Sequence, residues 1–258
     1  MSSKQTHDLA VVVMAAGKGK RMNDPSKAKV LYEINGRPMI DSVMDLAGSL
    51  RPARILVIVG HQGEAVTASL ARSHPAAETV VQAEQLGTGH AVMQTEAPLR
   101  EFSGDILVLS GDVPLLTRGT LESLFRHHRN EGADATILTA EPDNPSGYGR
   151  IVRNSDGSVG KIVEHKDASP EELGIREINS GIYVFEKSAL FEGLRHVTPD
   201  NVQKEYYLTD VFAFFRKTGK RVAAVKATDA VEILGINTVE ELENARVVLH
   251  RRARAGKS

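Results

Sequence analysis

The chain has 258 residues, a length that suits a single α/β domain. Its formal net charge of -1, with 25% charged and 41% hydrophobic residues, is that of an ordinary soluble globular protein, so no bulk attraction to nucleic acid or to an anionic membrane is expected. The sequence contains no cysteine, which excludes disulfides and thiolate metal sites. No apolar run approaches the roughly 18 residues that a membrane helix needs, and the first run is too short for a signal peptide. We therefore expect a cytoplasmic protein.

Apolar runs typical of buried strands alternate with stretches of helical spacing in the first half of the chain. The expected strands cover residues 9–15, 53–60 and 105–112, with one more ending at Gln82, and the expected helices cover 38–50, 63–73, a stretch from Thr88 and residues 117–132. This alternation predicts a Rossmann-like, mostly parallel sheet with helices on both faces. Ligands bind at the carboxyl ends of such strands, so we expect the site at the turns after Ala15, Gln82 and Asp112.

The second half of the chain is expected to add a small antiparallel lobe. Two alternating runs within residues 148–165 flank a Ser-Asp-Gly turn and predict a hairpin. A strand is expected over 177–186, a helix over 208–217 and a final amphipathic helix over 238–254. No internal repeat or low-complexity linker interrupts the sequence, so we expect one domain over residues 1–258.

The turn after the first strand, AAGKGKRMNDPSKAK at residues 15–29, is rich in basic side chains. It lacks the third glycine of a dinucleotide fingerprint and the Gly-Lys-Ser/Thr ending of a Walker loop. What remains is a Gly-x-Gly turn, whose backbone N–H groups can face phosphate oxygens, followed by Arg21 and Lys29. A solvated surface loop explains the turn alone equally well, because such turns are common.

The two other turns favour a phosphate site. QAEQLGTGH at residues 82–90 ends a strand and opens a helix, with an amide that can read a base edge and a Gly-Thr-Gly that lets backbone come close to a ring. Asp112 ends the strand that begins at residue 105 and leaves a carboxylate at the same edge of the sheet. A carboxylate beside phosphates suggests Mg²⁺, which prefers oxygen ligands.

Together these stretches resemble the sugar-1-phosphate nucleotidyltransferases, and most closely the N-acetylglucosamine-1-phosphate uridylyltransferase (pyrophosphorylase) domain of bacterial GlmU-type proteins. The glycine turn is weak support by itself, whereas QAEQLGTGHAV together with GYGR, EINSGIY and EYYLTD is specific. The matching segments span nearly the whole chain in family order: AAGKGKRM, KVL at 29–31, QAEQLGTGHAV at 82–92, GDVPLL at 111–116, GYGRIVR at 147–153, IVEHKDA at 162–168, EINSGIY at 177–183, EYYLTD at 205–210 and GIN at 235–237.

The resemblance implies a role for each matching residue. The implied catalytic residues are the cations Arg21 and Lys29. The implied contacts to the triphosphate, uracil and ribose are Ala15, Ala16, Gly17, Gln82, Gly87 and Thr88, and those to the sugar are Gly149, Glu164 and Asn179. The implied oxygen ligands of Mg²⁺, the expected cofactor, are Asp112 and Asn237. The nucleotide-binding half would cover residues 1–139, the sugar-binding half 140–237, and the C-terminal helix and tail 238–258.

The implied reaction is Mg²⁺-dependent transfer of UMP from UTP to a sugar-1-phosphate, with N-acetylglucosamine-1-phosphate as the expected acceptor. The attacking phosphate oxygen is already anionic near neutral pH, so charge repulsion and alignment are the obstacles and no general base is needed. UTP or dTTP with glucose-1-phosphate would use the same mechanism. A non-catalytic nucleotide-sugar-binding or regulatory protein is the alternative of another class. The histidines have no part in this chemistry, and we expect His90, His127 and His128 on helix surfaces.

Three of these residues also have simpler explanations. Asp112 can be a strand-terminal turn residue, Asn237 an N-cap of the final helix, and Glu164 a surface charge on the hairpin. Lys166 lies in the same Glu-His-Lys-Asp segment, and the sequence favours a contact of Lys166 to the sugar phosphate no more than it favours no contact.

The chain departs from the family pattern in the phosphate loop and before Asp112. Lys20 stands where the pattern has Thr, Ala28 stands where it has Pro, and the loop that leads to Lys29 is one residue longer than usual. Ser110 replaces a common Tyr, so the sugar pocket is expected to differ. The sequence stops before the family's acetyltransferase β-helix, so acetyl transfer is not expected, and no oligomeric state is predicted.

Overall fold

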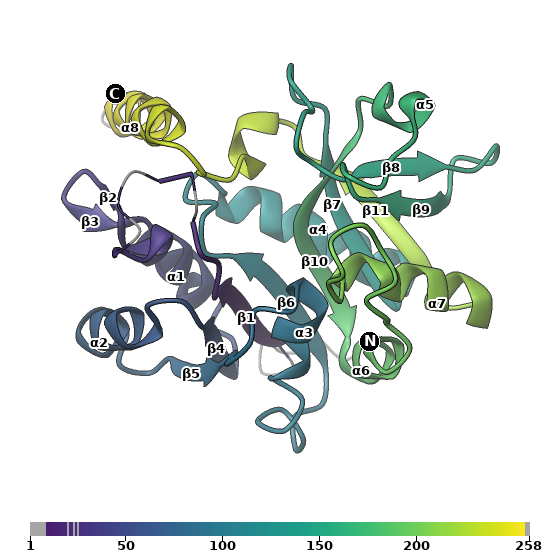
Figure 1. Cartoon of the computed structure of the whole chain (residues 1–258), viewed down its shortest axis with the longest axis horizontal. Coiled ribbons are helices and arrows are strands. Elements are labelled where there is room, and N and C mark those ends of the chain that lie inside the picture. The colour runs from purple at the N-terminus through teal and green to yellow at the C-terminus, as the bar shows by residue number, and fades with distance from the viewer. Residues whose placement is uncertain (1–8, 20, 23, 25, 256–258) are drawn as a thin grey trace.

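The computed structural model describes residues 9–19, 21, 22, 24 and 26–255. Lys20, one of the basic side chains of the glycine turn, lies outside the described residues. Over the rest, a mixed sheet is flanked by helices (Figure 1). The helices are α1 (Met39–Ser49), α2 (Gly63–Ser73), α3 (Thr88–Met93), α4 (Arg118–Glu131), α5 (Pro170–Leu173), α6 (Lys187–Leu194), α7 (Val211–Thr218) and α8 (Val239–Ala255), with 3-10 turns η2 (Lys29–Leu31), η3 (Leu208–Asp210) and η4 (Ala230–Ile233).

The main sheet of the described residues has nine strands and is mostly parallel. In spatial order they are β11 (Val222–Lys226), β7 (Ala135–Ala140), β10 (Ile178–Glu186), β6 (Asp105–Ser110), β1 (Leu9–Ala15), β4 (Arg54–Val59) and β5 (Glu78–Val81), with β8 (Arg150–Arg153) and β9 (Val159–Val163) as a branch and β2 (Glu33–Ile34) and β3 (Arg37–Pro38) as a separate ribbon. Only β10 runs antiparallel to its neighbours β6 and β7 along the main order. The expected fold class is confirmed.

Strand β1 is buried on both faces, which explains its unbroken apolar sequence. Val11 and Val13 pack with α1, α2 and α4 on one face, while Ala10 and Val12 pack with α3, α6 and α7 on the other. Side chains alternate between the faces of a strand, so a strand covered on both sides needs apolar residues at every position. All four of these side chains are fully buried.

The small lobe is joined to the main sheet through β10. At one end of this strand Ile178 pairs with Arg150 of β8, and further along Tyr183 pairs with Val108 of β6. A bulge separates the two parts, and Gly181 lies within it at φ +77°, a conformation that favours glycine. One strand therefore carries both a lobe residue and a core residue, and this fixes the lobe beside the carboxyl edge of β6.

His128 corrects one expectation. It is not on a helix surface: its side chain is buried between α4 and the sheet, with Nδ1 2.8 Å from the Thr136 hydroxyl of β7. Its Nε2 lies 3.6 Å from a carboxylate oxygen of Asp105. A buried polar ring needs such partners, because an unpaired polar group in the core is costly.

In the part of the chain that the structure describes, no helix has both the length and the apolar character needed to cross a membrane.

Candidate active site

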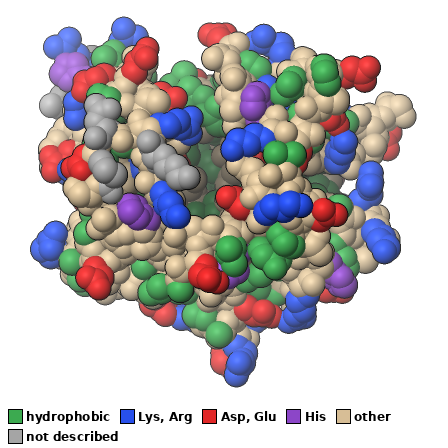
Figure 2. All heavy atoms as spheres, viewed as in Figure 1, with side chains coloured by type: hydrophobic (Ala, Val, Ile, Leu, Met, Phe, Trp, Pro, Cys, Tyr) green, Lys and Arg blue, Asp and Glu red, His purple; other side chains and the backbone are tan. Residues whose placement is uncertain are grey.

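A cavity of about 560 Å³ opens at the carboxyl ends of β1, β5 and β6. From β1 the chain proceeds outward to β4 and β5 and then returns to β6 on the opposite side of β1, and such reversals create ligand crevices in open sheets. Figure 2 shows the molecule hollowed between the part that carries α8 and the part that carries β8 and β9, with Lys or Arg side chains on both sides. Most of the expected site residues line the cavity: Ala15, Ala16, Gly17, Arg21, Lys29, Gln82, Gly87, Thr88, Asp112 and Asn237.

The glycine turn passes directly over Lys29. Gly19 adopts the left-handed conformation (φ +57°), and a Cβ atom there would lie 2.8 Å from the Lys29 Cβ. The turn closes through the Met22 N–H, which donates to the Gly19 carbonyl (2.9 Å), and the Arg21 side chain is exposed at the cavity. Glycine is therefore required at position 19 both for backbone conformation and for the close approach.

Lys29 brings two side-chain oxygens from distant parts of the chain together. Its ammonium donates to Asp112 Oδ2 and to Asn237 Oδ1 (3.0 Å), and the Lys29 and Asp112 side chains are only 14% and 15% exposed. The Asn237 amide is oriented by its own NH₂ group, which donates to the Gly235 carbonyl (3.2 Å). The Ile236 N–H donates to the Asp112 carbonyl (2.9 Å), which ties the two oxygen-bearing segments together.

The N-cap explanation for Asn237 does not hold. Thr238 caps α8, since its hydroxyl accepts from the Glu241 N–H (3.2 Å). The Glu241 carboxylate in turn accepts from the N–H groups of Asn237 (2.6 Å) and Thr238 (3.0 Å), a capping-box arrangement. The Asn237 side chain is left to face Lys29 and the cavity.

The donor set at this point fits Mg²⁺. A carboxylate and an amide oxygen already converge on one cation, and Mg²⁺ prefers such hard oxygen ligands while it keeps several waters or phosphate oxygens. Among the described residues, no group of three or more His, Asp and Glu side chains is arranged to hold a metal. Waters or phosphate oxygens would therefore complete the coordination of an ion held by Asp112 and Asn237.

The segment after β5 is clamped against the EYYL segment near residue 206. The Tyr206 N–H donates to the Leu86 carbonyl and the Gly89 N–H donates to the Tyr206 carbonyl, both at 2.7 Å. The Thr88 hydroxyl accepts from the Leu208 N–H (3.0 Å). Gly87 has φ +110°, and a Cβ atom on it would lie 2.6 Å from the Tyr206 carbonyl oxygen. This clamp fixes the backbone that faces the cavity.

Gln82 is the buried polar side chain of this segment. It is 3% exposed, and its Nε2 donates to the Gly87 carbonyl (3.0 Å) and faces His90 Nδ1 (3.2 Å). Among the described residues, the amide has hydrogen-bond partners only at its Nε2 end, which leaves its oxygen for a ligand in the cavity that it lines.

The three expected sugar contacts lie together, but outside the residues that line the cavity. The Asn179 N–H donates to the Gly149 carbonyl (2.9 Å), and a Cβ atom on Gly149 would lie 3.4 Å from a Glu164 carboxylate oxygen. Burial raises the pKa of Glu164 against the opposing effect of its hydrogen bond from the Thr209 hydroxyl (3.0 Å). Glu164 is therefore not a simple surface charge on the hairpin.

One hydrogen bond and one electrostatic effect relate this sugar cluster to the cavity. The Tyr148 hydroxyl, beside Gly149, accepts from the Gly235 N–H (3.2 Å) next to the Asn237 segment. Glu205, which lines the cavity, acts electrostatically on Glu164. The cluster and the cavity therefore adjoin each other.

Gln203 and Glu205 line the cavity although our sequence analysis gave them no role. The EYYLTD match at 205–210 pointed to this region, but no residue within it could be assigned from spacing alone. Lys166 is not among the residues that line the cavity, but it donates to Gln203 Oε1 (2.5 Å), and Gln203 does line it.

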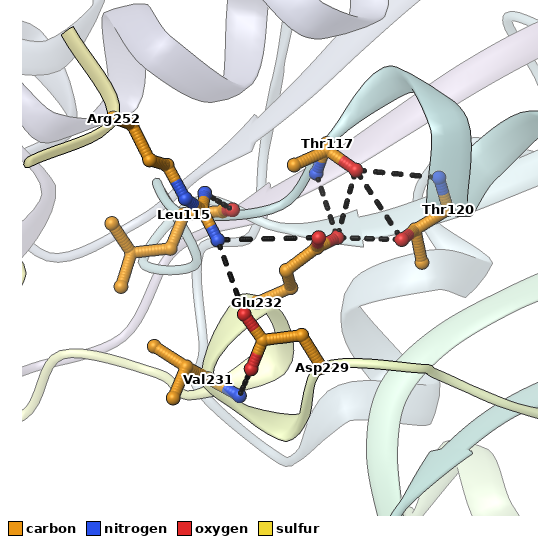
Figure 3. Close-up of polar contacts among 7 residues, drawn as sticks. All are labelled: Leu115, Thr117, Thr120, Asp229, Val231, Glu232 and Arg252. Atoms are coloured by element: carbon orange, nitrogen blue, oxygen red, sulfur yellow. Dashed lines mark hydrogen bonds and ion pairs between the residues drawn. The ribbon is translucent and has the colours of Figure 1, made fainter. Parts of the chain in front are cut away.

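Polar contacts join the segment that follows Asp112 to the segment that precedes Asn237 and to α8 (Figure 3). Glu232 accepts from the Thr117 N–H (3.2 Å) and from the hydroxyls of Thr117 (2.8 Å) and Thr120 (2.5 Å) at the start of α4. Arg252 of α8 donates to the Leu115 carbonyl (2.6 Å) and lies 3.9 Å from Glu232. The segment after β6, the segment before Asn237 and α8 are therefore cross-linked.

The fold is that of the nucleotidyl transferases. The family model described as Nucleotidyl transferase matches residues 10–231, and the chain belongs to this family. Among individual relatives, the chain is similar to the bifunctional protein GlmU of Lactobacillus delbrueckii subsp. bulgaricus, with 48% identity over 246 residues, which are 95% of this chain and 52% of that protein. The GlmU protein of Pelotomaculum thermopropionicum is 46% identical over 245 residues, 95% of this chain and 53% of that protein.

The chain spans about half the length of the curated relatives it matches. Among solved structures, a UDP-glucose pyrophosphorylase complexed with UDP-glucose has a TM-score of 0.75 at 17% identity, covering 94% of this chain and 98% of that one. A putative glucose-1-phosphate thymidylyltransferase from Bacillus anthracis has a TM-score of 0.70 at 18% identity, covering 93% and 94%. These two likenesses concern the fold. The expected family is confirmed by the family match and the relatives.

Proposed function

We propose that the chain transfers UMP from UTP to N-acetylglucosamine-1-phosphate in a Mg²⁺-dependent reaction that takes place in the cytoplasm and releases pyrophosphate. The observation that carries the proposal is the convergence of Lys29, Asp112 and Asn237 in one cavity with the glycine turn and Gln82. Its similarity to GlmU proteins over 95% of the chain supports the choice of nucleotide and sugar.

The chemistry requires an oxygen of the sugar phosphate to attack the α-phosphorus of UTP while the bond from this phosphorus to the β-phosphate bridging oxygen breaks. The attacking oxygen is already anionic, so the residues need to offset charge and hold the reactants in line. The backbone of Ala15, Ala16 and Gly17 and the side chains of Arg21 and Lys29 would hold the triphosphate. When bound by Asp112 and Asn237, Mg²⁺ would neutralise phosphate charge.

The two substrates would occupy adjoining parts of the molecule. Gln82, Gly87 and Thr88 would contact the uracil and ribose in the nucleotide-binding half, residues 1–139. Gly149, Glu164 and Asn179 would contact the sugar in the half formed by residues 140–237. Tyr148 and Glu205 support this arrangement, because the Tyr148 hydroxyl accepts from the segment that leads to Asn237, and Glu205 lines the cavity near Gly87 while its charge contributes to the raised pKa of Glu164.

The test is pyrophosphate release from UTP or dTTP with Mg²⁺ and a panel of sugar-1-phosphates. We expect release with UTP and N-acetylglucosamine-1-phosphate. Release only with glucose-1-phosphate would replace the acceptor, and no release with any pair would contradict the enzyme hypothesis. Asp112→Ala should lower turnover about a thousandfold, the scale of losing a major electrostatic group. Asp156→Ala, at the exposed hairpin turn, is the matched control and should retain activity.

A further inference from the structure

His90 lies next to Gln82, outside the residues that line the cavity, and two amide groups face its ring. Gln82 Nε2 is 3.2 Å from His90 Nδ1, and Gln94 Nε2 is 3.2 Å from His90 Nε2. The half-buried ring also packs against Tyr206, with 6.2 Å between ring centroids. A neutral imidazole has one acceptor nitrogen and one N–H, so it can accept from only one of the two NH₂ groups.

Gln82 has the stronger need for that acceptor. Its side chain is buried, and an NH₂ hydrogen without a partner there would cost the full desolvation of the group. Gln94 is only partly buried and already donates to the His90 carbonyl oxygen (2.9 Å). We therefore assign Nδ1 of His90 as the acceptor for Gln82 and place the ring proton on Nε2. The partly buried Gln94 amide then has to turn so that its oxygen, which accepts, faces Nε2 in place of its NH₂ group.

This bond decides which end of the Gln82 amide faces the cavity. The NH₂ group is held by the Gly87 carbonyl and by His90 Nδ1, while no described residue donates to the carbonyl oxygen. The side-chain oxygen of Gln82 is a hydrogen-bond acceptor, so it favours a base that has an N–H group at the position facing it. Uracil carries a hydrogen on N3, whereas cytosine has a lone pair there. Turned over, the same amide would present NH₂ and favour cytosine.

We propose that His90 is a positioning residue that fixes the amide orientation of Gln82 and thereby selects uracil over cytosine nucleotides. The inference rests on the proposed function, since it takes Gln82 to face the base. It goes beyond that function because it gives the base selectivity to a residue that does not touch the nucleotide. A ring that only packs against Tyr206 would have no such effect.

Three variants separate these roles. His90→Phe keeps an aromatic ring against Tyr206 and removes both nitrogens. His90→Asn restores an acceptor oxygen near the place of Nδ1. Gln94→Ala removes only the competing amide. The measurement is kcat/KM for UTP and for CTP with the same sugar phosphate, together with kcat at saturating UTP.

We expect His90→Phe to lower the UTP-to-CTP ratio of kcat/KM about five- to tenfold, since one of the two hydrogen bonds that orient the amide is lost. His90→Asn should restore the ratio, Gln94→Ala should keep or raise it, and kcat at saturating UTP should change little in all three. An unchanged ratio in His90→Phe, or an equal loss in His90→Asn, would overturn the inference.

Failure of the proposed function would be seen separately, as absence of pyrophosphate release by the unaltered protein. Calorimetric dissociation constants for UTP and CTP in the same variants then test His90 without turnover. A UTP preference in the unaltered protein that His90→Phe lowers and His90→Asn restores would support the inference. Binding of neither nucleotide, or an unaltered preference, would overturn it.

Discussion

Replacing Lys29 by Met tests the phosphate site most directly, because it removes the ammonium and keeps a long apolar side chain. The Lys29 ammonium is largely buried between Asp112 and Asn237 at the cavity, so it is already oriented before substrates bind. Removing such a preorganised charge costs roughly 10²- to 10³-fold in kcat, or about 3–4 kcal/mol of transition-state stabilisation. We expect a loss of this size in single-turnover pyrophosphate release.

Lys27→Met is the matched control. The Lys27 ammonium lies 5.2 Å from the centroid of the Tyr32 ring rather than in the cavity lining. Its loss should cost about 0.5–1 kcal/mol in unfolding free energy, the value of an exposed cation–π contact, and leave kcat nearly unchanged. A larger loss of turnover in Lys27→Met than in Lys29→Met would mean that the lengthened loop presents Lys27 to the phosphates.

The same Lys29→Met change should strengthen Mg²⁺ binding to the nucleotide-free protein. The ammonium donates to the two oxygens that would hold the ion, and its charge repels a divalent cation. Hydrogen bonds to charged groups contribute about 1.5–3 kcal/mol, so their removal should tighten binding about tenfold or more. Calorimetric titration measures this. Weaker Mg²⁺ binding together with lost turnover would refute the reasoning, because Lys29 would then be needed to orient the two ligands.

Three further outcomes are expected elsewhere. Burial, with the charge of Asp167, raises the pKa of Asp210 to about 6 from 3.8. The native state then binds the proton more tightly than the unfolded state. The unfolding free energy should therefore fall by about 1–2 kcal/mol, after allowance for partial exposure, as pH rises from 3.8 to about 6. Urea denaturation measures this fall, which should be smaller in Asp210→Asn. Gly87→Ala would place a Cβ atom 2.6 Å from the Tyr206 carbonyl oxygen, so it should weaken UTP binding in calorimetry and lower the unfolding free energy by about 1–3 kcal/mol. Gly48→Ala, whose Cβ would meet nothing within 4 Å, is the control and should do neither. Equal effects of the two variants would contradict the clamp. Arg252→Ala should lower the thermal unfolding temperature, with a loss of about 1–3 kcal/mol, and an unchanged melt would mean that the network in Figure 3 does not stabilise α8.

The sequence was most informative where one physical cause acts on consecutive residues. Strand β1 is covered on both faces, so each of its positions had to be apolar and the strand could be predicted within a residue. The turns after β1, β5 and β6 meet because the carboxyl ends of parallel strands share one edge of the sheet. The place of the cavity could therefore be predicted from the topology, whereas the roles of the residues that line it stay predictions.

Elements that depend on distant partners could not be predicted. Strand β7 was missed because Thr136 and Thr139 interrupt its apolar sequence. Both are buried with partners outside the strand: Thr136 contacts His128 of the preceding helix, and Thr139 donates to Glu177, which is 38 positions away. Strand β11 is rich in alanine, which has low strand propensity. The sequence could not distinguish the buried His128 from histidines on helix surfaces. Its burial depends on the packing of α4 against the sheet, where Thr136 is its partner.

The contact of Lys29 with Asn237 has a consequence for how the protein is made. The two residues are 208 positions apart, and Asp112 lies between them in the sequence. During synthesis the first strands and the glycine turn emerge long before the segment that carries Asn237. A nascent chain that has not yet released this segment from the ribosome lacks one of the two oxygens at the phosphate end of the cavity. Assembly of this end of the cavity therefore cannot precede synthesis of the Asn237 segment, which follows every described strand of the main sheet in the sequence.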